Sequence, residues 1–555
     1  MEEEQKRLRI VPLGGLGEVG KNMMALEWDK KILIIDAGLS FPEEKNPGID
    51  YIIPNISYLK KRKKDILGIV FTHGHYDHIG AIPYIMDDLG NPPLFGSPLT
   101  LGILEKRQEE YPNQPKLKLN KVKDGSQINL GPFNIEFFHQ NHNIPDNLGL
   151  FIETPVGNIV NTSDFKFDST PTNAPPTDFD KIKSLGKKGV LLMLSDSTGA
   201  ENEGRSLSEK TICENMEKIF KEAKGRLITA TFASLINRIQ DIIYLSEKYG
   251  RKVVVEGYGM QTNVEIARNL KLLKIKKGTI VTPKKALDLP DNKVTLICTG
   301  AQGEERAALV RIANGEHRSF HLKSNDTVVL SSSTVPGNER AVQNLRDDIL
   351  RQGATVFHSK MMDIHAKGHA NEEELKEMIK MLKPKFLIPI HGQYSMLIRH
   401  KEIAESTKVP KGVFVIENGE PALLSKDGIQ LEKKKISSKP VLIDGSGIGD
   451  VGGVVLYDRQ ELAESGIFVV IVVRDKKEKT LKNSPDIISR GFIYLRNSQD
   501  MLAASRKKIR EIMKESSQNN YDVKKTKYLL KKKLESFLYS RTKRRPIVVP
   551  VVIEV

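Results

Sequence analysis

Thr72-His73-Gly74-His75-Tyr76-Asp77-His78 is the stretch that decides the fold we expect for this chain. The apolar residues 66–71 precede it and read as a buried strand, and residues 79–86 follow it and read as a helix. The stretch therefore lies on a strand-to-helix turn at a sheet edge, where functional residues are often found. Its three imidazoles and one carboxylate suit Zn²⁺ or Mn²⁺. Chance gives such a cluster in about 3–4 of ten thousand chains of this composition, so a solvated polar turn is the weaker interpretation.

Composition limits the class of protein. A chain of 555 residues predicts more than one domain. It has no apolar run of membrane-spanning length and no signal peptide, so we expect a cytoplasmic protein. Its two cysteines, Cys213 and Cys298, have no Cys or His neighbour at metal spacing, so metals must be held by His and carboxylates. The net charge of +16 fits a polyanionic partner and, equally, a solubility device.

Further polar residues follow two predicted strands. His139 and His142 follow the strand at residues 133–138, and Asp164 follows the strand at residues 157–162. Each residue alone would most often be an ordinary loop residue. Together, in this order, they are candidates for the remaining metal ligands.

A long interval separates the next buried strand, residues 191–196, from the last candidate ligand, His391. The interval alternates strands and helices, which predicts a whole α/β domain inserted into the first one. Its predicted strands are residues 226–232, 252–255, 293–298 and 327–330.

The two ends of the chain have simpler patterns. Residues 11–22 are glycine-rich, but residues 24–28 and 31–36 read as a hairpin, so we interpret the glycines as a tight turn and not as a nucleotide loop. After a linker that begins near residue 433, a small α/β unit contains the very basic residues 506–545. That stretch is either a solvated helix face or an RNA contact.

The motif His-x-His-x-Asp-His after a strand resembles the ligand motif of the metallo-β-lactamase fold. The inserted α/β domain resembles that of β-CASP nucleases. Over essentially its full length, the chain is identified by resemblance as a member of the bacterial ribonuclease J family. The segments that carry this resemblance are residues 14–22, 233–238, 311–315, 335–338, 542–546 and 553–555.

The resemblance implies an α/β protein: a metallo-β-lactamase αββα sandwich with an inserted β-CASP α/β domain and a small C-terminal α/β domain. The expected boundaries are 1–207 and 360–432 for the two parts of the metallo-β-lactamase domain, 208–359 for the insertion, 433–458 for the linker and 459–555 for the C-terminal domain.

The resemblance also implies two Zn²⁺ ions, with Mn²⁺ or Mg²⁺ as alternatives. His142 is preferred to His139 because its context, His-Asn-Ile-Pro-Asp, matches the family. Asp36 resembles the family's structural Asp, which orients the metal-binding loop. The implied ligands are His73, His75 and His142 for one ion, and Asp77, His78 and His391 for the other, with Asp164 bridging.

By the same resemblance, His369 is the general acid and Asp196 its partner; the alternative for His369 is a core histidine satisfied by the backbone. Lys367 stands where the family commonly has a small hydroxyl residue, so it either adds a charged phosphate contact or blocks the pocket. Ser163 and Gln393 stand where Gly and Glu are usual. The implied 5′-phosphate site consists of Phe232, Ala233, Ser234, His365, Ala366, Lys367, Gly368 and His369.

We therefore expect a two-metal ribonuclease that degrades single-stranded RNA, both mRNA and rRNA precursors, from a 5′-monophosphorylated end and also internally. A homodimer or homotetramer is expected, with a paralogue or other RNA-decay proteins as further partners. A hydrolase of thioesters or lactams and a non-catalytic RNA-binding subunit are the alternatives. All seven ligand positions are intact, which favours an active enzyme.

Overall fold

The computed structural model describes residues 7–555 except 43–45, 336, 446, 478–479, 493–498 and 519–520. The chain divides into two compact units. One contains the chain up to Ser40 together with Ile52–Val441, and the other contains Phe41–Tyr51 together with Leu442–Val555. Among the described residues, no helix combines the length and the apolar character needed to span a bilayer. Both cysteines are free thiols.

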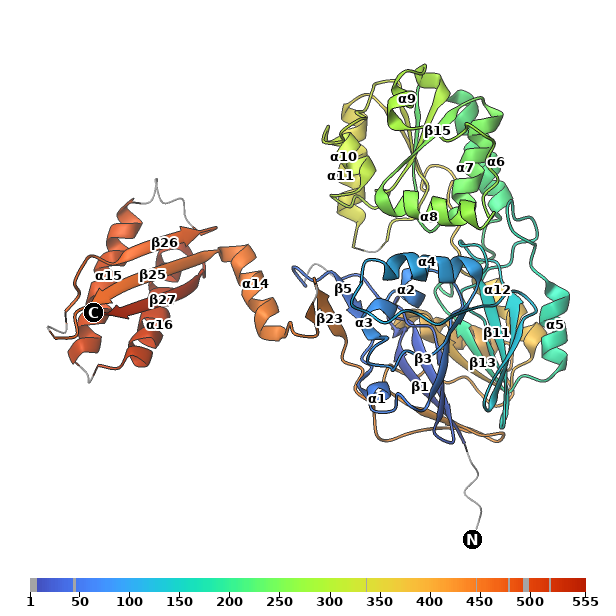
Figure 1. Ribbon diagram of the computed structural model, residues 1–555, viewed down its shortest axis with the longest axis horizontal. Helices are drawn as coiled ribbons and strands as arrows, with labels where there is room; N and C mark the ends of the chain where they lie inside the picture. The colour runs from blue at the N-terminus through green and yellow to red at the C-terminus, as the bar shows by residue number, and fades with distance from the viewer. Residues whose placement is uncertain are drawn as a thin grey trace, which may run out of the picture. The chain divides into compact units, whose positions relative to one another are not determined.

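Two β-sheets that pack face to face form the centre of the first unit (Figure 1). Leu26, Leu33, Phe137, Leu150 and Phe386 from both sheets are buried in one shared core. The first sheet has the order β22 (Ile429–Leu431), β21 (Ala422–Leu424), β1 (Leu8–Gly14), β3 (Met23–Trp28), β4 (Lys31–Ile35), β6 (Ile66–Val70), β7 (Leu94–Gly96), β8 (Leu119–Lys121). The second has the order β19 (Phe386–Ile390), β13 (Leu192–Asp196), β12 (Gly157–Asn161), β11 (Leu148–Thr154), β10 (Phe133–His139), β9 (Gln127–Leu130).

Helices cover the outer sides of this pair of sheets. On the second sheet, α5 (Phe179–Lys187), α12 (Glu372–Leu382) and α13 (Tyr394–Ser406) bury apolar side chains against the face that points away from the shared core. On the first sheet, α4 (Pro98–Gln108) packs on β7 and β8. The predicted αββα sandwich is therefore confirmed.

The ligand stretch differs from the prediction in one respect. The single helix predicted over residues 79–86 is wrong, because the chain forms two short helices, α2 (Tyr76–Ile79) and α3 (Ile82–Ile85). The Ala81 N–H donates to the Ala37 carbonyl (2.9 Å) instead of continuing the helix, and Pro83 has no N–H to donate. As a consequence, Asp77 and His78 lie on a helical turn.

The insertion contains a five-stranded sheet in which every pairing is parallel, as the alternation of strands and helices predicted. The chain leaves the second sheet at the end of β13 and returns at β19. Because β13 and β19 pair in parallel with Asp196 opposite Ile390, the insertion brings Asp196 and His391 together. The strand order is β15 (Lys252–Glu256), β16 (Val294–Cys298), β14 (Leu227–Ala230), β17 (Thr327–Leu330), β18 (Thr355–His358), and the main helices are α6 (Glu209–Glu222), α7 (Ile236–Lys248), α8 (Tyr258–Asn269), α10 (Ala308–Ala313) and α11 (Glu339–Arg351).

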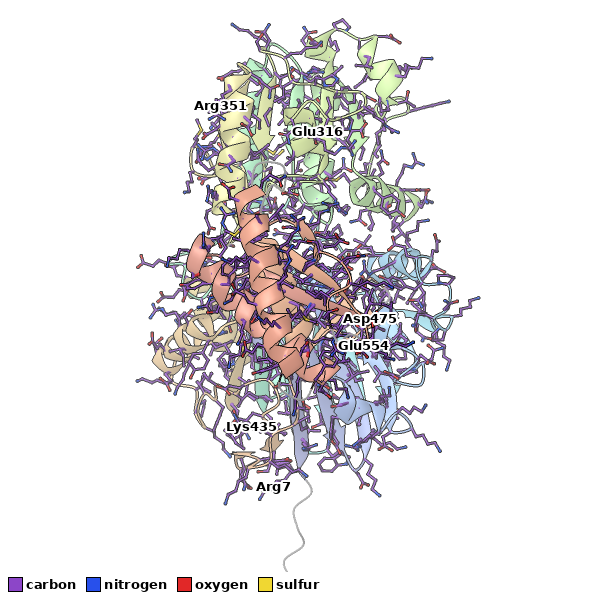
Figure 2. The ribbon with its side chains drawn as sticks, turned by 90° about the vertical axis from the view of Figure 1, so that its left-hand side faces the viewer. Arg7, Glu316, Arg351, Lys435, Asp475 and Glu554 are labelled. Atoms are coloured by element: carbon purple, nitrogen blue, oxygen red, sulfur yellow. The ribbon has the colours of Figure 1, made fainter. Side chains whose placement is uncertain are left out.

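The second unit is built on β25 (Ile467–Arg474), which pairs antiparallel with β26 (Asp486–Arg490) and parallel with β27 (Ile547–Glu554). Asp475 and Glu554 lie close together at the ends of β25 and β27 (Figure 2). α15 (Gln499–Gln518) and α16 (Val523–Thr542) cover one face of the sheet. The other face is apolar and partly exposed; Ile488 and Ile553 are each 44% exposed.

The predicted division of the chain differs from the observed units. Residues 433–458, predicted as a linker, contain β23 (Val441–Asp444), β24 (Gly447–Ile448) and the start of α14 (Gly453–Ser465). Residues 41–51, predicted within the first domain, belong to the second unit, where the Asp50 N–H donates to the Ile443 carbonyl (2.9 Å) and Arg459 donates to the Pro47 carbonyl (3.2 Å). Contacts between residues so far apart leave no periodic signal in the sequence.

Candidate active site

The ligand stretch begins where β6 ends, and Asp36 holds it in place. The Asp36 carboxylate accepts the Thr72 N–H (2.8 Å) and the Thr72 hydroxyl (2.9 Å). Its Oδ2 also lies 2.8 Å from His78 Nδ1. Because β4 and β6 pair in parallel, Asp36 and the stretch emerge at the same sheet edge. A carboxylate on Nδ1 leaves Nε2 of His78 to face the site.

Three strands end in unusual backbone conformations beside the site. The φ values are 59° at Asp36, 57° at Ser163 and 53° at His391. These residues follow β4, β12 and β19, directly or within two positions. Left-handed backbone is uncommon in residues other than glycine and is often found at functional sites. At Ser163 the conformation is supported by a bond from its hydroxyl to Asn147 (2.6 Å) and from its N–H to Asn161 (2.8 Å). These bonds hold Ser163 in the left-handed conformation, at a position where the family resemblance leads us to expect glycine.

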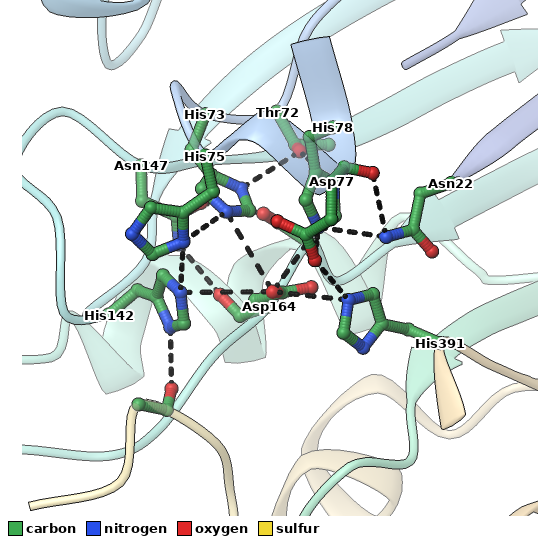
Figure 3. A network of polar contacts seen from close by, with 12 residues as sticks. Asn22, Thr72, His73, His75, Asp77, His78, His142, Asn147, Asp164 and His391 are labelled. Carbon is green, nitrogen blue, oxygen red and sulfur yellow. Dashed lines mark hydrogen bonds and ion pairs between the residues drawn. The ribbon is translucent and has the colours of Figure 1, made fainter. Parts of the chain in front are cut away.

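The first group of predicted ligands is a trio of imidazoles (Figure 3). His75 Nδ1 lies 3.0 Å from His73 Nε2 and 3.2 Å from His142 Nε2. Burial lowers the pKa of His75 to about 4 and that of His142 to about 3. His142 Nδ1 lies 2.7 Å from the Gly368 carbonyl, which fixes the proton there and leaves Nε2 as a lone pair. Three neutral nitrogens thus converge on one point, as tetrahedral Zn²⁺ requires.

The second group combines Asp77, His78, Asp164 and His391, whose donor atoms lie within 4.8 Å of one another. Asp77 Oδ2 is 3.2 Å from His391 Nε2. Burial alone would lower the pKa of His391, but Asp164 and Asp77 raise it to about 9. Burial likewise would raise the pKa of Asp164, but the imidazoles of His391 and His78 hold it well below its usual range. The proton on His391 is one that a divalent cation would displace.

One carboxylate oxygen faces both groups. Asp164 Oδ2 lies 3.3 Å from His78 Nε2 and 3.5 Å from His391 Nε2 in the second group. The same oxygen lies 3.7 Å from both His73 Nε2 and His142 Nε2 in the first. The two groups together offer five imidazoles and two carboxylates. This donor set fits two divalent cations of the Zn²⁺ or Mn²⁺ type that share Asp164.

A histidine–carboxylate pair adjoins the two groups. His369 Nδ1 lies 2.8 Å from Asp196 Oδ2 at the end of β13. Burial would lower the pKa of His369, but the Asp196 carboxylate raises it above its usual value. The ring centroid of His369 is 5.1 Å from that of His142 and 5.5 Å from that of His391. An imidazole in this position, with Nδ1 held by a carboxylate, can donate a proton from Nε2.

Comparisons with known proteins point to one family. Ribonuclease J 1 of Streptococcus pyogenes is 37% identical over 98% of this chain and 97% of its own length. Ribonuclease J2 of Bacillus subtilis is 37% identical over the full length of both chains. Family models match the metallo-beta-lactamase superfamily at residues 16–155, the Ribonuclease J beta-CASP domain at 224–349, the Zn-dependent metallo-hydrolase RNA specificity domain at 357–415 and the Ribonuclease J C-terminal domain at 454–555.

The chain belongs to the ribonuclease J family. A solved structure of a protein of unknown function from Enterococcus faecalis V583 shares the fold, with a TM-score of 0.55 and 15% identity over 75% of this chain and all of that one. As a member of the ribonuclease J family, this chain is a metal-dependent nuclease that hydrolyses RNA.

The two segments that the ribonuclease J resemblance assigned to 5′-phosphate binding belong to different parts of the first unit, and Arg238 of α7 donates to the Ile364 carbonyl (2.6 Å) beside the second segment. Phe232, Ala233 and Ser234 connect β14 to α7. The His365 imidazole is half-buried, and its desolvation beside the Arg238 guanidinium lowers its pKa to about 3. Ala366 is buried, and Gly368 packs its Cα against His142, where a Cβ would clash.

Lys367, in the second of these segments, is the residue for which the resemblance left two possibilities, a phosphate contact or a blocked pocket. Its side chain is exposed, and Nζ donates to Asn202 Oδ1 at 2.9 Å. The bond is an exposed one that a phosphate could replace at little cost.

Sequence reasoning missed several residues that orient the ligands. Thr198 Oγ1 lies 2.6 Å from His391 Nδ1 and donates to the His391 carbonyl (3.0 Å), which turns Nε2 toward Asp164. Asn22, which closes the glycine-rich segment, lies 3.1 Å from His78 Nε2 and donates to the Asp77 carbonyl (3.1 Å). The glycine-rich segment is therefore a wall of the site. In the sequence, the amide side chain of Asn22 at the end of this segment was the one sign that the segment contributes to the site.

Proposed function

We propose that this chain is an active two-metal ribonuclease that degrades RNA 5′ to 3′ from monophosphorylated ends and also cleaves internally, in mRNA decay and rRNA maturation. The observation that carries this proposal is the position of Asp164 Oδ2, which faces four imidazole nitrogens from two ligand groups. No group of this kind is needed for RNA binding alone, so the arrangement favours catalysis over a scaffold role.

Seven side chains would hold the two ions in this proposal. Bound ions supply a water nucleophile near neutral pH and offset charge on the phosphodiester. Asp36 and Thr198 orient His78 and His391 for this task through their Nδ1 atoms. One ion would be held by His73, His75 and His142 and the other by Asp77, His78 and His391, with Asp164 shared.

His369 would protonate the leaving 3′ oxygen. Its Nδ1 is bonded to Asp196, so the proton to be transferred is on Nε2. Asp196 is itself fixed by the Thr198 N–H, which donates to its Oδ1 at 2.9 Å. The carboxylate stabilises the charged imidazole before transfer and keeps the ring oriented afterwards.

The 5′-terminal phosphate would bind between the segment at residues 232–234 and the segment at residues 365–369. Lys367 would move from Asn202 to this phosphate, since an ammonium gives a charge-assisted bond where a hydroxyl gives a neutral one.

The experiment that tests this function compares three RNAs that differ only at the 5′ end, with a monophosphate, a triphosphate or a hydroxyl group. Products are mapped from both ends and metal content is measured on the same protein. Mononucleotides from the monophosphorylated RNA and internal fragments from all three are expected. Stoichiometric RNA binding with no cleavage at full metal occupancy would identify a non-catalytic subunit instead.

We further propose that the chain assembles as a homodimer or homotetramer through the free face of the C-terminal sheet. Val549, Ile488 and Ile553 on that face are 36–44% exposed, and contiguous apolar surface of this kind is typical of protein interfaces. Light scattering of Ile488→Lys against the unchanged protein tests this, and an unaltered mass would refute it.

A further inference from the structure

The C-terminal unit carries a basic helix face that the catalytic site does not use. Residues 506–545 hold 15 Lys and Arg against 4 Asp and Glu, so this stretch supplies +11 of the chain's net charge of +16. α16 buries Leu530, Leu534 and Leu538 against the sheet, and its opposite side points to solvent. We call that side the α16 outer face; its residues are Lys524, Lys525, Tyr528, Lys531, Lys532 and Tyr539.

The lysines of this face are largely unpaired. Lys531 reaches Glu535 only at 4.0 Å, an exposed helix pair of little strength. In the part of the chain that the structure describes, Lys524, Lys525 and Lys532 have no acidic partner. Positive charge so concentrated repels itself, and this cost is recovered when a polyanion binds and releases its counterions.

Two aromatic rings are interleaved with these lysines. Tyr528 is 65% exposed and Tyr539 is 40% exposed. They are 11 residues apart in the sequence, which is about three helical turns, so both rings project from the same side of α16. Arg545 stacks its guanidinium 4.6 Å from the Tyr539 ring centroid, and Lys543 lies 5.6 Å from it. A face that only needed solubility would not expose two rings along its length.

We propose that the α16 outer face is a second RNA-binding surface, which binds single-stranded RNA on the unit that does not contain the ligand groups; the inference rests on the chain acting on RNA. Lysines would contact phosphates, and Tyr528 would stack on an unpaired base. The exposed rings favour single strands over duplex RNA, because bases inside a helix have no free face on which to stack.

The test measures the binding of the full-length protein, with metal removed, to an unstructured RNA about 30 nucleotides long across a salt titration. Neutralising three lysines, in Lys524→Gln, Lys525→Gln and Lys532→Gln together, should lower the salt slope by about two units, since each single-strand phosphate contact contributes roughly 0.7. A matched control neutralises Lys224, Lys383 and Lys426, three exposed lysines of the first unit, and should leave the slope unchanged.

The aromatic contribution is tested separately. Tyr528→Ala should weaken binding of the single strand roughly tenfold, while Tyr528→Phe, which keeps the ring, should bind normally. Binding of a duplex of the same length should not respond to either change. All variants should hydrolyse a nitrophenyl phosphodiester at the original rate, because none touches the ligand groups.

A salt slope equal to that of the control triple would overturn the proposal, and the face would then be a solvated one. A changed oligomeric mass with unchanged RNA binding would also overturn it, in favour of a protein interface. If the protein without substitutions does not hydrolyse the nitrophenyl phosphodiester, the proposed two-metal function is wrong but this surface is not affected. The two failures are therefore distinguishable.

Discussion

His369→Ala is expected to slow RNA hydrolysis by roughly 10²–10⁴-fold, as loss of a general acid typically does. His369 belongs to neither of the groups assigned above to the two metals, so both ions and the affinity for RNA should be retained. The control is His321→Ala, an exposed histidine of the inserted domain, which should leave the rate unchanged.

The loss of rate expected from changing Asp196, the partner of His369, can be worked out separately. The bond between His369 Nδ1 and Asp196 Oδ2 is 2.8 Å long, and a hydrogen bond to a charged group is worth about 1.5–3 kcal/mol. Asp196→Asn keeps the shape but removes the charge, so it should cost roughly 10–150-fold. Because both side chains act in one step, the double variant should be no slower than His369→Ala alone.

The assay compares RNA with a nitrophenyl phosphodiester, whose leaving group needs no proton. The three variants should lose far less rate on the nitrophenyl ester than on RNA. Equal losses on both substrates would show that His369 has a structural role. Fully additive losses in the double variant would show that the two residues act independently, and either result would refute the reasoning.

Three further predictions concern other residues. The His75→Ala variant should lose bound metal and RNA hydrolysis with little change in thermal unfolding. Near-normal activity with less bound metal would count against the two-metal mechanism. Lys367→Ser should weaken binding of short 5′-monophosphorylated RNA by roughly 1–2 kcal/mol and leave internal cleavage of 5′-blocked RNA nearly unchanged; equal affinities would place the lysine in solvent. Glu209 is buried between Lys166 (2.9 Å) and Arg238 (2.5 Å), so Glu209→Gln should destabilise the fold by about 3–5 kcal/mol, whereas the exposed Glu222→Gln should not.

The Glu209 carboxylate should also make the stability of the folded protein depend on pH. Burial would raise the pKa of Glu209, but Arg238 and Lys166 lower it to about 2 from the ordinary 4.5. A depressed carboxyl pKa stabilises the folded state above the unfolded-state value. This stabilisation should therefore be present above pH 4.5 and be lost as the pH falls toward 2. Thermal midpoints across this range should fall less steeply in Glu209→Gln, and parallel curves would contradict the assignment.

Much of the site could be predicted because its ligands follow strands. The apolar runs before His73, His142 and Asp164 are visible in the sequence, and strands that end at a common edge bring such residues together. The pairing of β13 with β19 does the same for Asp196 and His391. The sequence also showed the parallel α/β insertion through its alternation of strands and helices.

The remaining features depend on which strands become neighbours. Thr198 contacts His391 across 193 positions in the sequence, and Asn22 contacts His78 across 56. No periodicity records such contacts. The interrupted helix after His78 has the same origin, because the Ala81 N–H is taken by the Ala37 carbonyl at the end of another strand.

The central claim is that two ions bound around Asp164 are both required for RNA hydrolysis. The most direct measurement is a titration of metal-free protein with Zn²⁺ or Mn²⁺, in which bound metal and the rate on 5′-monophosphorylated RNA are followed together. We predict little hydrolysis at one equivalent and full activity at two. Full activity at one equivalent, or activity that persists when metal is removed, would contradict the account.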